Sequence, residues 1–184
     1  SGETSSVRDR HLVWVLARAE AIVPGFDGPE PASAATTARR LLNDARAAIH
    51  HAEQTSQAAA IWQLVCYLAP LCFYDGLIDE ALGWAARAAA VDDGTHPDAT
   101  APGLVAAALL ATSRGDHDEI VDALERATEA AQLAGNRRSQ GRAILLGAAH
   151  EAWHQPADAL PALARGIDLC ASSGDPTWAA WGSC

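Results

Sequence analysis

Three segments of this chain repeat one pattern: the end of a helix, a short turn and the start of a second, amphipathic helix. They are residues 74–91, 114–131 and 154–170. Each segment carries an Ala-Leu pair shortly after an aspartate, and the pairs begin at Ala81, Ala123 and Ala159. Subtraction gives intervals of 42 and 36 residues between these alanines. Because self-similarity at such a period is typical of stacked helical hairpins, the pattern predicts a helical repeat protein.

The composition favours helix throughout. The chain has 184 residues, 49% of them hydrophobic, which suits one domain with a sizeable core. Alanine and leucine dominate, and both lose little conformational freedom in a helix. No stretch alternates apolar and polar residues for a useful length. We therefore expect an all-α, right-handed superhelical solenoid of antiparallel hairpins.

Helical periodicity and turn residues divide the chain into three parts. Residues 1–55 are predicted to form a helical pair, whose first helix ends at Pro24-Gly25. Residues 56–174 are predicted to form three hairpins, with a longer loop between the first two at 94–102; the hairpins are 56–91, 101–134 and 137–173. Residues 175–184 are predicted to start a further helix that is cut short, with Trp178 and Trp181 on one face.

Aligning the hairpins on their Ala-Leu pairs brings other positions into register. Leucines stand thirteen residues before each pair and small residues twelve before it: Leu68, Leu110 and Leu146, and then Ala69, Ala111 and Gly147. A small residue beside a leucine lets two helices approach closely. The arrangement resembles a degenerate tetratricopeptide repeat, although the early tryptophan of that pattern and its constant period of about 34 residues are missing.

The N-terminal part carries a more specific resemblance. The matching positions are His11, Leu16, Ala19, Glu20, Pro24, Gly25, Gly28, Pro29, Leu41, Asp44, Arg46, Ala47, Ala48 and Ile49. They resemble the tetratricopeptide-like helical region of actinobacterial LuxR/AfsR-type signal-transduction ATPase transcriptional regulators. The resemblance implies a sensor or scaffold that is not itself catalytic and that contacts other domains of a parent regulator. A P-loop and a basic helix-turn-helix do not occur in these residues, so ATPase and DNA-binding activity would belong to other parts of that parent.

Charge and hydropathy limit the partners and the compartment. The net charge of −10 disfavours direct contact with nucleic acid. We expect no membrane span, and the irregular spacing of four cysteines favours reduced thiols in the cytoplasm. We also expect no cofactor.

One short motif points to a different chemistry. Residues 150–154 read HEAWH, which places His150 and His154 one helical turn apart and Glu151 beside them, as in zinc hydrolases. No histidine follows His154, so a third ligand would have to be an aspartate. A second histidine pair, His50-His51, consists of adjacent residues, whose side chains point in different directions from a helix. We interpret it as a solvated helix end. A zinc hydrolase built on HEAWH and a free-standing tetratricopeptide adaptor remain the alternatives to the regulator hypothesis.

The predicted binding surface is an apolar concave groove. In a tetratricopeptide array the first helix of each hairpin lines this groove. The register assigns to it Gln63, Cys66, Phe73, Val105, Ala108, Thr112, Ile144, Ala148 and Glu151. With few charges, the groove is expected to take a protein segment or a small hydrophobic effector. The two tryptophans near the C-terminal end also suggest an end-to-end dimer.

Overall fold

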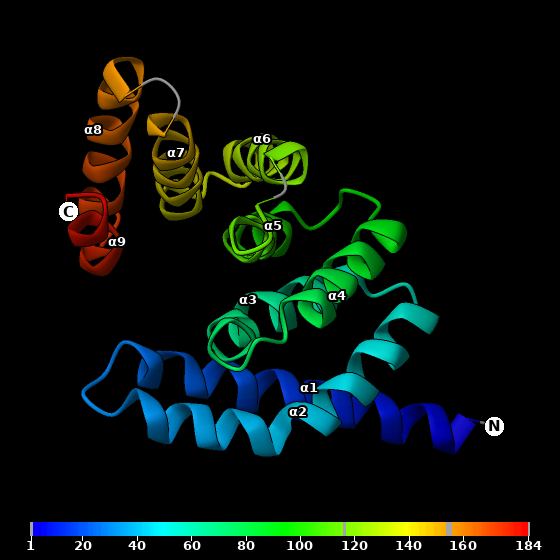
Figure 1. Cartoon of the computed structure of the whole chain (residues 1–184). Helices are drawn as coiled ribbons and strands as arrows, with labels where there is room; N and C mark the ends of the chain where they lie inside the picture. The colour runs from blue at the N-terminus through cyan, green and yellow to red at the C-terminus, as the bar shows by residue number, and fades with distance from the viewer. Residues whose placement is uncertain (1, 116, 154–155, 184) are drawn as a thin grey trace.

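The computed structural model describes the chain except residues 1, 116, 154–155 and 184, and the side chains of residues 2–5 and 158 (Figure 1). The described residues form helices and contain no strand. The helices are α1 (Gly2–Phe26), α2 (Pro31–Gln54), α3 (Ala58–Tyr74), α4 (Ile78–Val91), α5 (Pro97–Thr112), α6 (His117–Leu133), α7 (Arg137–Ala152), α8 (Pro156–Ser172) and α9 (Pro176–Trp181).

Each helix packs against the next one in the chain. In addition α1 contacts α3, α3 contacts α5 and α5 contacts α7, so these four odd-numbered helices form a continuous inner row. Figure 1 shows this progression from the long α1–α2 pair to α8 and α9 at the other end. These contacts confirm the prediction of an all-α chain built from consecutively packed helices.

The turns that end α2, α3, α6 and α8 share one backbone hydrogen-bond pattern. A residue with positive φ follows the helix, and the next residue donates its N–H to the carbonyl five positions back, which satisfies an orphan carbonyl of the last turn. The hydrogen bonds are Gln57 to Ala52, Leu77 to Cys72, Asn136 to Ala131 and Asp175 to Cys170, at 2.8–2.9 Å. Glycine supplies the positive φ at 76, 135 and 174, whereas Ser56 (φ 53°) does so in the first of these turns.

Two predicted boundaries were wrong, and both involve proline. The first helix runs through Pro24 to Phe26, although a proline at this position removes one i→i−4 hydrogen bond of the helix. Helix α5 begins at Pro97, where the fixed φ of proline suits a first helical position, so the loop before it is only 92–96. Asp92 holds this short loop by accepting hydrogen bonds from the Gly94 N–H (2.9 Å) and from Trp62 Nε1 (2.7 Å).

One main core cluster runs from Leu12 in α1 to Leu146 in α7. The aligned leucines at 68, 110 and 146 are all buried, as are the alanines that open the three Ala-Leu pairs. Helices α3 and α5 approach closely at Gly103. There a Cβ added at Gly103 would lie 2.7 Å from Trp62 Cε3, so only glycine lets the two helices meet at this distance. In the described part of the chain, no helix combines the length and the apolarity that a membrane span needs.

Candidate functional site

The structure distributes the predicted groove residues over the core and over separate surfaces. Val105 and Ala148 are 3% and 5% exposed and Ala108 is fully buried, because successive odd-numbered helices pack directly on one another. A ligand could not touch these three side chains without displacing the helices that cover them. At these three positions, the repeat register therefore identifies the face of the odd-numbered helices that packs in the core, and not an open groove.

The other predicted groove residues reach solvent at different places. Gln63, Cys66, Ile144 and Glu151 are half-buried, and Phe73 and Thr112 are exposed at the ends of α3 and α5. Phe73 packs edge-to-face with Tyr74, with ring centroids 5.9 Å apart. Only Ile144 contributes to one of the described cavities.

That cavity is a cleft of about 770 Å³ between α6 and α8, with α7 as its floor. We call it the α6–α8 cleft. Its apolar lining comes mainly from Leu124, Ala143, Ile144, Gly147, Pro161 and Ala162. Glu125 and Glu129 lie one turn apart on the α6 wall, and Arg165 lies on the α8 wall. The volume is in the range of small-molecule sites, and the lining suits an amphipathic ligand.

Gly147 keeps the floor of the cleft open. A Cβ added there would meet only Leu124 Cδ1, at 3.7 Å, which is ordinary van der Waals contact. A side chain at this position would therefore fit the helix and occupy the cleft. The register of the three hairpins predicts Gly147 as a packing residue between the helices of a hairpin, but the structure places it in the lining of this cleft.

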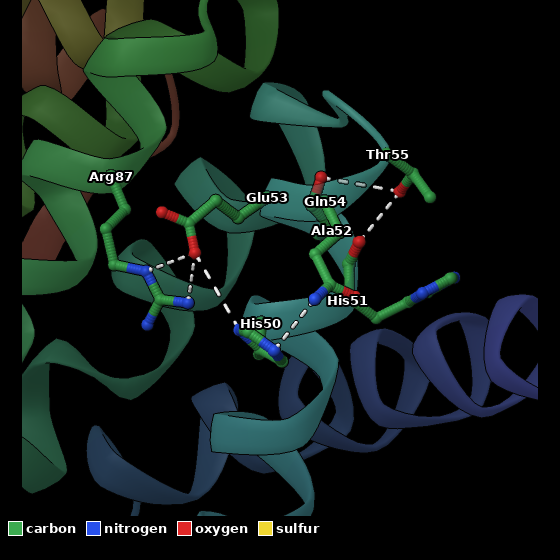
Figure 2. Close-up of polar contacts among 7 residues, drawn as sticks. All are labelled: His50, His51, Ala52, Glu53, Gln54, Thr55 and Arg87. Carbon is green, nitrogen blue, oxygen red and sulfur yellow. Dashed lines mark hydrogen bonds and ion pairs between the residues drawn. The ribbon is translucent and has the colours of Figure 1, made fainter.

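At the other end of the molecule, ion pairs connect the even-numbered helix α2 to the next hairpin. Arg39 bonds Asp75 and Arg46 bonds Glu80, both at 2.6 Å. Figure 2 shows the third pair, in which Arg87 bonds Glu53 at 2.5 Å. These guanidinium hydrogen bonds lower the pKa of all three carboxyl groups. No ion pair between described side chains joins α6 to α8. Among the described side chains, the α6–α8 cleft is therefore not spanned by ion pairs of the kind that join α2 to the α3–α4 hairpin.

Two arginines on α7 meet a buried carboxylate. Asp175, which is 1% exposed, accepts hydrogen bonds from Arg138 Nε at 3.0 Å and Arg142 Nε at 2.6 Å. Burial works against ionisation of Asp175, but these two hydrogen bonds outweigh it and lower the pKa of the carboxyl. The sequence register had assigned no basic residue to the groove. Both arginines are engaged by the chain's own aspartate, so they fix α9 against α7.

The pair His50-His51 is only partly the solvated helix end that the sequence predicted. His50 is exposed, and its ring nitrogens lie near Gln54 (3.0 Å) and Glu53 (3.9 Å) (Figure 2). His51 is instead 6% exposed, and its Nε2 lies 2.7 Å from Asp9 Oδ1 on α1. His51 is therefore a packing residue between α1 and α2, because the register of α2 turns it toward the first helix.

The HEAWH motif lies at the end of α7 and is only partly described. His150 and Glu151 are in the last turn of α7, whereas His154 lies outside the described residues. His150 Nε2 is 2.6 Å from His117 Nδ1 on α6, a neighbour that the motif did not indicate. No group of three or more potential metal ligands occurs among the described residues.

The cysteines of the described chain are free thiols. Cys72 and Cys170 are fully buried and Cys66 is half-buried. Burial raises the pKa of the Cys66 and Cys170 thiols and raises that of Cys72 to about 12. Thiols with a raised pKa stay protonated near neutral pH and are therefore poor nucleophiles.

No family model matches this sequence, and comparisons with curated proteins and with solved structures give no significant match.

Proposed function

We propose that this chain is a ligand- or protein-binding module, not catalytic in itself, that serves as the sensor or scaffold part of a larger cytoplasmic transcriptional regulator. In this proposal the fold is a right-handed solenoid of degenerate tetratricopeptide-like hairpins. The observation that carries the proposal is the open α6–α8 cleft, which combines an apolar floor with charged walls.

The recurrence of helix-ending turns supports a repeat architecture. Residues with positive φ stand at Ser56, Gly76, Gly94, Gly115, Gly135 and Gly174. Ser56, Gly94, Gly135 and Gly174 lie between hairpins, at intervals of 38, 41 and 39 residues, and Gly76 and Gly115 lie inside hairpins, 39 residues apart. Repeats of two helices contact only their neighbours, so binding at one hairpin interface can change the stacking of the next.

The lining of the cleft indicates the class of ligand. Ile144, Leu124 and Pro161 offer apolar contact area, and the two glutamates of α6 face a single arginine of α8 across the opening. A ligand with apolar side chains and one basic group next to them would bury its hydrophobic part on α7 and pair its charge with Glu125 or Glu129. We therefore propose a short amphipathic protein segment as the ligand of this cleft.

Peptide selection with a blocked variant tests this assignment. Displayed twelve-residue peptides are selected on the wild-type chain, and the affinity of the selected peptides is then measured for Gly147→Trp. We expect peptides with apolar residues and a basic residue whose affinity falls at least tenfold, because the new indole fills the cleft. Gly83→Trp is the matched control, since Gly83 is an exposed helix position with no atom within 4 Å of an added Cβ. Equal binding to the wild-type and Gly147→Trp proteins would refute the site.

The parent regulator is tested separately, by sequencing the coding DNA on both sides of residues 1–184. A P-loop upstream and a helix-turn-helix at either end would support the proposed context. An open reading frame confined to these residues would favour the adaptor instead.

A further inference from the structure

A second candidate site lies at the opposite end of the chain, in a groove between α1 and α2. We call it the α1–α2 groove. Its first part has a volume of about 380 Å³ and is lined by Trp14, Arg18, Ala21, Ile22, Thr37, Arg40, Leu41 and Asp44. A second cavity of about 510 Å³ shares Ala21, Ile22 and Thr37 with it and extends to Pro24 and Pro29. The shared residues make the two cavities parts of one groove with a charged end and a mainly apolar end.

Two arginines at the charged end form no ion pair with the acidic side chains that the structure describes. Arg18 and Arg40 are exposed, and no ion pair joins either of them to a described carboxylate. Asp44 lines the same groove, but its Oδ1 lies 3.2 Å from His11 Nε2. Arg18 instead lies over the ring of Trp14, with its Cζ 5.8 Å from the ring centroid. The groove thus presents guanidinium groups that are free to receive an anion.

The first helical pair carries much less net negative charge than the rest of the chain. Residues 1–55 hold six arginines against seven carboxylates, whereas residues 56–184 hold seven arginines against sixteen carboxylates. An anion would be repelled by most of the molecule and would encounter its least negative surface at the first helical pair. The α6–α8 cleft, with two glutamates and one arginine, has the opposite preference.

The apolar surface in the groove adds a second requirement for the ligand. Trp14 is 46% exposed, and its ring stacks on His11 at a centroid distance of 6.0 Å. An indole left half-open beside two guanidinium groups provides both a flat apolar contact and a nearby positive charge. Ile22, Pro24 and Pro29 continue the apolar surface away from the arginines.

We propose that the α1–α2 groove binds a small amphiphilic anion, an organic molecule with a flat apolar body and one carboxylate, sulfonate or phosphate group. The anionic group pairs with Arg18 and Arg40, and the body lies against Trp14 and along Ile22. This proposal does not depend on the α6–α8 cleft, because the two sites share no residue.

The test uses two fluorescent probes that differ in charge, on the 184-residue chain. The anion is 8-anilinonaphthalene-1-sulfonate, and its uncharged analogue is N-phenyl-1-naphthylamine. We expect the sulfonate to bind at least tenfold more tightly than the analogue, and its affinity to fall as ionic strength rises. In the Arg18→Gln/Arg40→Gln variant we expect its dissociation constant to rise at least fivefold, with the analogue changed less than twofold. In Thr37→Trp, whose side chain would fill the shared middle of the groove, both probes should bind more weakly.

Arg126→Gln/Arg137→Gln is the control, because it removes the same charge from α6 and α7, outside the groove. It should bind the sulfonate like the wild-type chain. Three results would overturn the proposal: no fluorescence enhancement by the sulfonate, equal weakening in both double variants, or loss of sulfonate binding in Gly147→Trp. The first would show that the groove takes no such anion, and the others would place the probe elsewhere.

Discussion

A pair of Gly→Ala substitutions tests how closely the inner row of helices is packed. Gly103 and Gly83 both lie inside helices, and alanine is favoured over glycine there by about 0.5–1 kcal/mol. Nothing lies within 4 Å of a Cβ added at Gly83, so Gly83→Ala should gain this amount in full. At Gly103 the same Cβ would lie 2.7 Å from Trp62 Cε3 and 3.0 Å from both Cβ and the carbonyl oxygen of Trp62.

Trp62 cannot move away easily. Two of the three close atoms, its Cβ and carbonyl oxygen, are fixed by the backbone of α3, and its side chain is 1% exposed. Its Nε1 also donates a hydrogen bond to Asp92 at 2.7 Å. Overpacking of this kind costs about 1–3 kcal/mol. After the gain in helix propensity is subtracted, Gly103→Ala should destabilise the fold by up to about 2.5 kcal/mol.

Thermal and urea unfolding, followed by circular dichroism, measure both variants under the same conditions. For a chain of this size 1 kcal/mol corresponds to about 2–4 °C in Tm. Gly103→Ala should therefore lower Tm by up to roughly 10 °C, and Gly83→Ala should raise it by roughly 1–4 °C. If both variants were stabilised equally, α3 and α5 would not approach as closely as described, and the account of the inner row would fail.

Four further changes follow from the same structure. Asp175→Ala should cost about 2–3 kcal/mol at pH 7, since it leaves two arginines without their acceptor. Because the pKa of Asp175 is lowered in the folded chain, the stability of the wild-type protein should also fall as pH drops below about 4. Urea titrations should show that stability depends less on pH in Asp175→Ala. A double-mutant cycle on Arg46 and Glu80 should give a coupling below about 1 kcal/mol, because the arginine is 43% exposed; a value above 2 kcal/mol would contradict this. Ser56→Gly should stabilise by about 0.5–1 kcal/mol in urea melts, since it relieves a positive φ; a loss would mean that the serine side chain is needed. Cys72 should react with iodoacetamide at pH 7.5 only after unfolding, as mass spectrometry would show; fast labelling of the native chain would contradict its burial.

The helical class and the order of the helices could be predicted from the sequence. Apolar residues at helical spacing, short turns and the absence of period-two alternation are local properties of the sequence. They predict consecutive helices, and the structure has them in that order. The leucines and alanines aligned by the repeat are buried for the same reason. The errors at Pro24 and Pro97 arose because a proline can begin a helix, end it or lie inside it near an end, and the residue type alone does not distinguish these cases.

The position of the candidate sites could not be predicted in this way. The repeat register correctly places Ile144 on α7, but it cannot say that α6 and α8 stand apart above this residue and leave a cleft. It assigned Ala108 to an open groove, whereas contact between consecutive odd-numbered helices buries that side chain completely. Periodicity identifies the apolar face of a helix, but the distance between helices decides whether that face is covered.

The sequence alone determined that this chain forms helices, where most of them begin and end, and which side chains can be buried, since these depend on the propensity and spacing of neighbouring residues. The tertiary structure decided which charged groups meet. Asp175 accepts hydrogen bonds from two arginines of α7, while Arg18 and Arg40 line a groove with the exposed ring of Trp14 and form no ion pair with a described carboxylate. The physical reason is that ion pairs and grooves depend on how helices distant in the sequence are spaced and rotated, and local patterns do not encode that geometry.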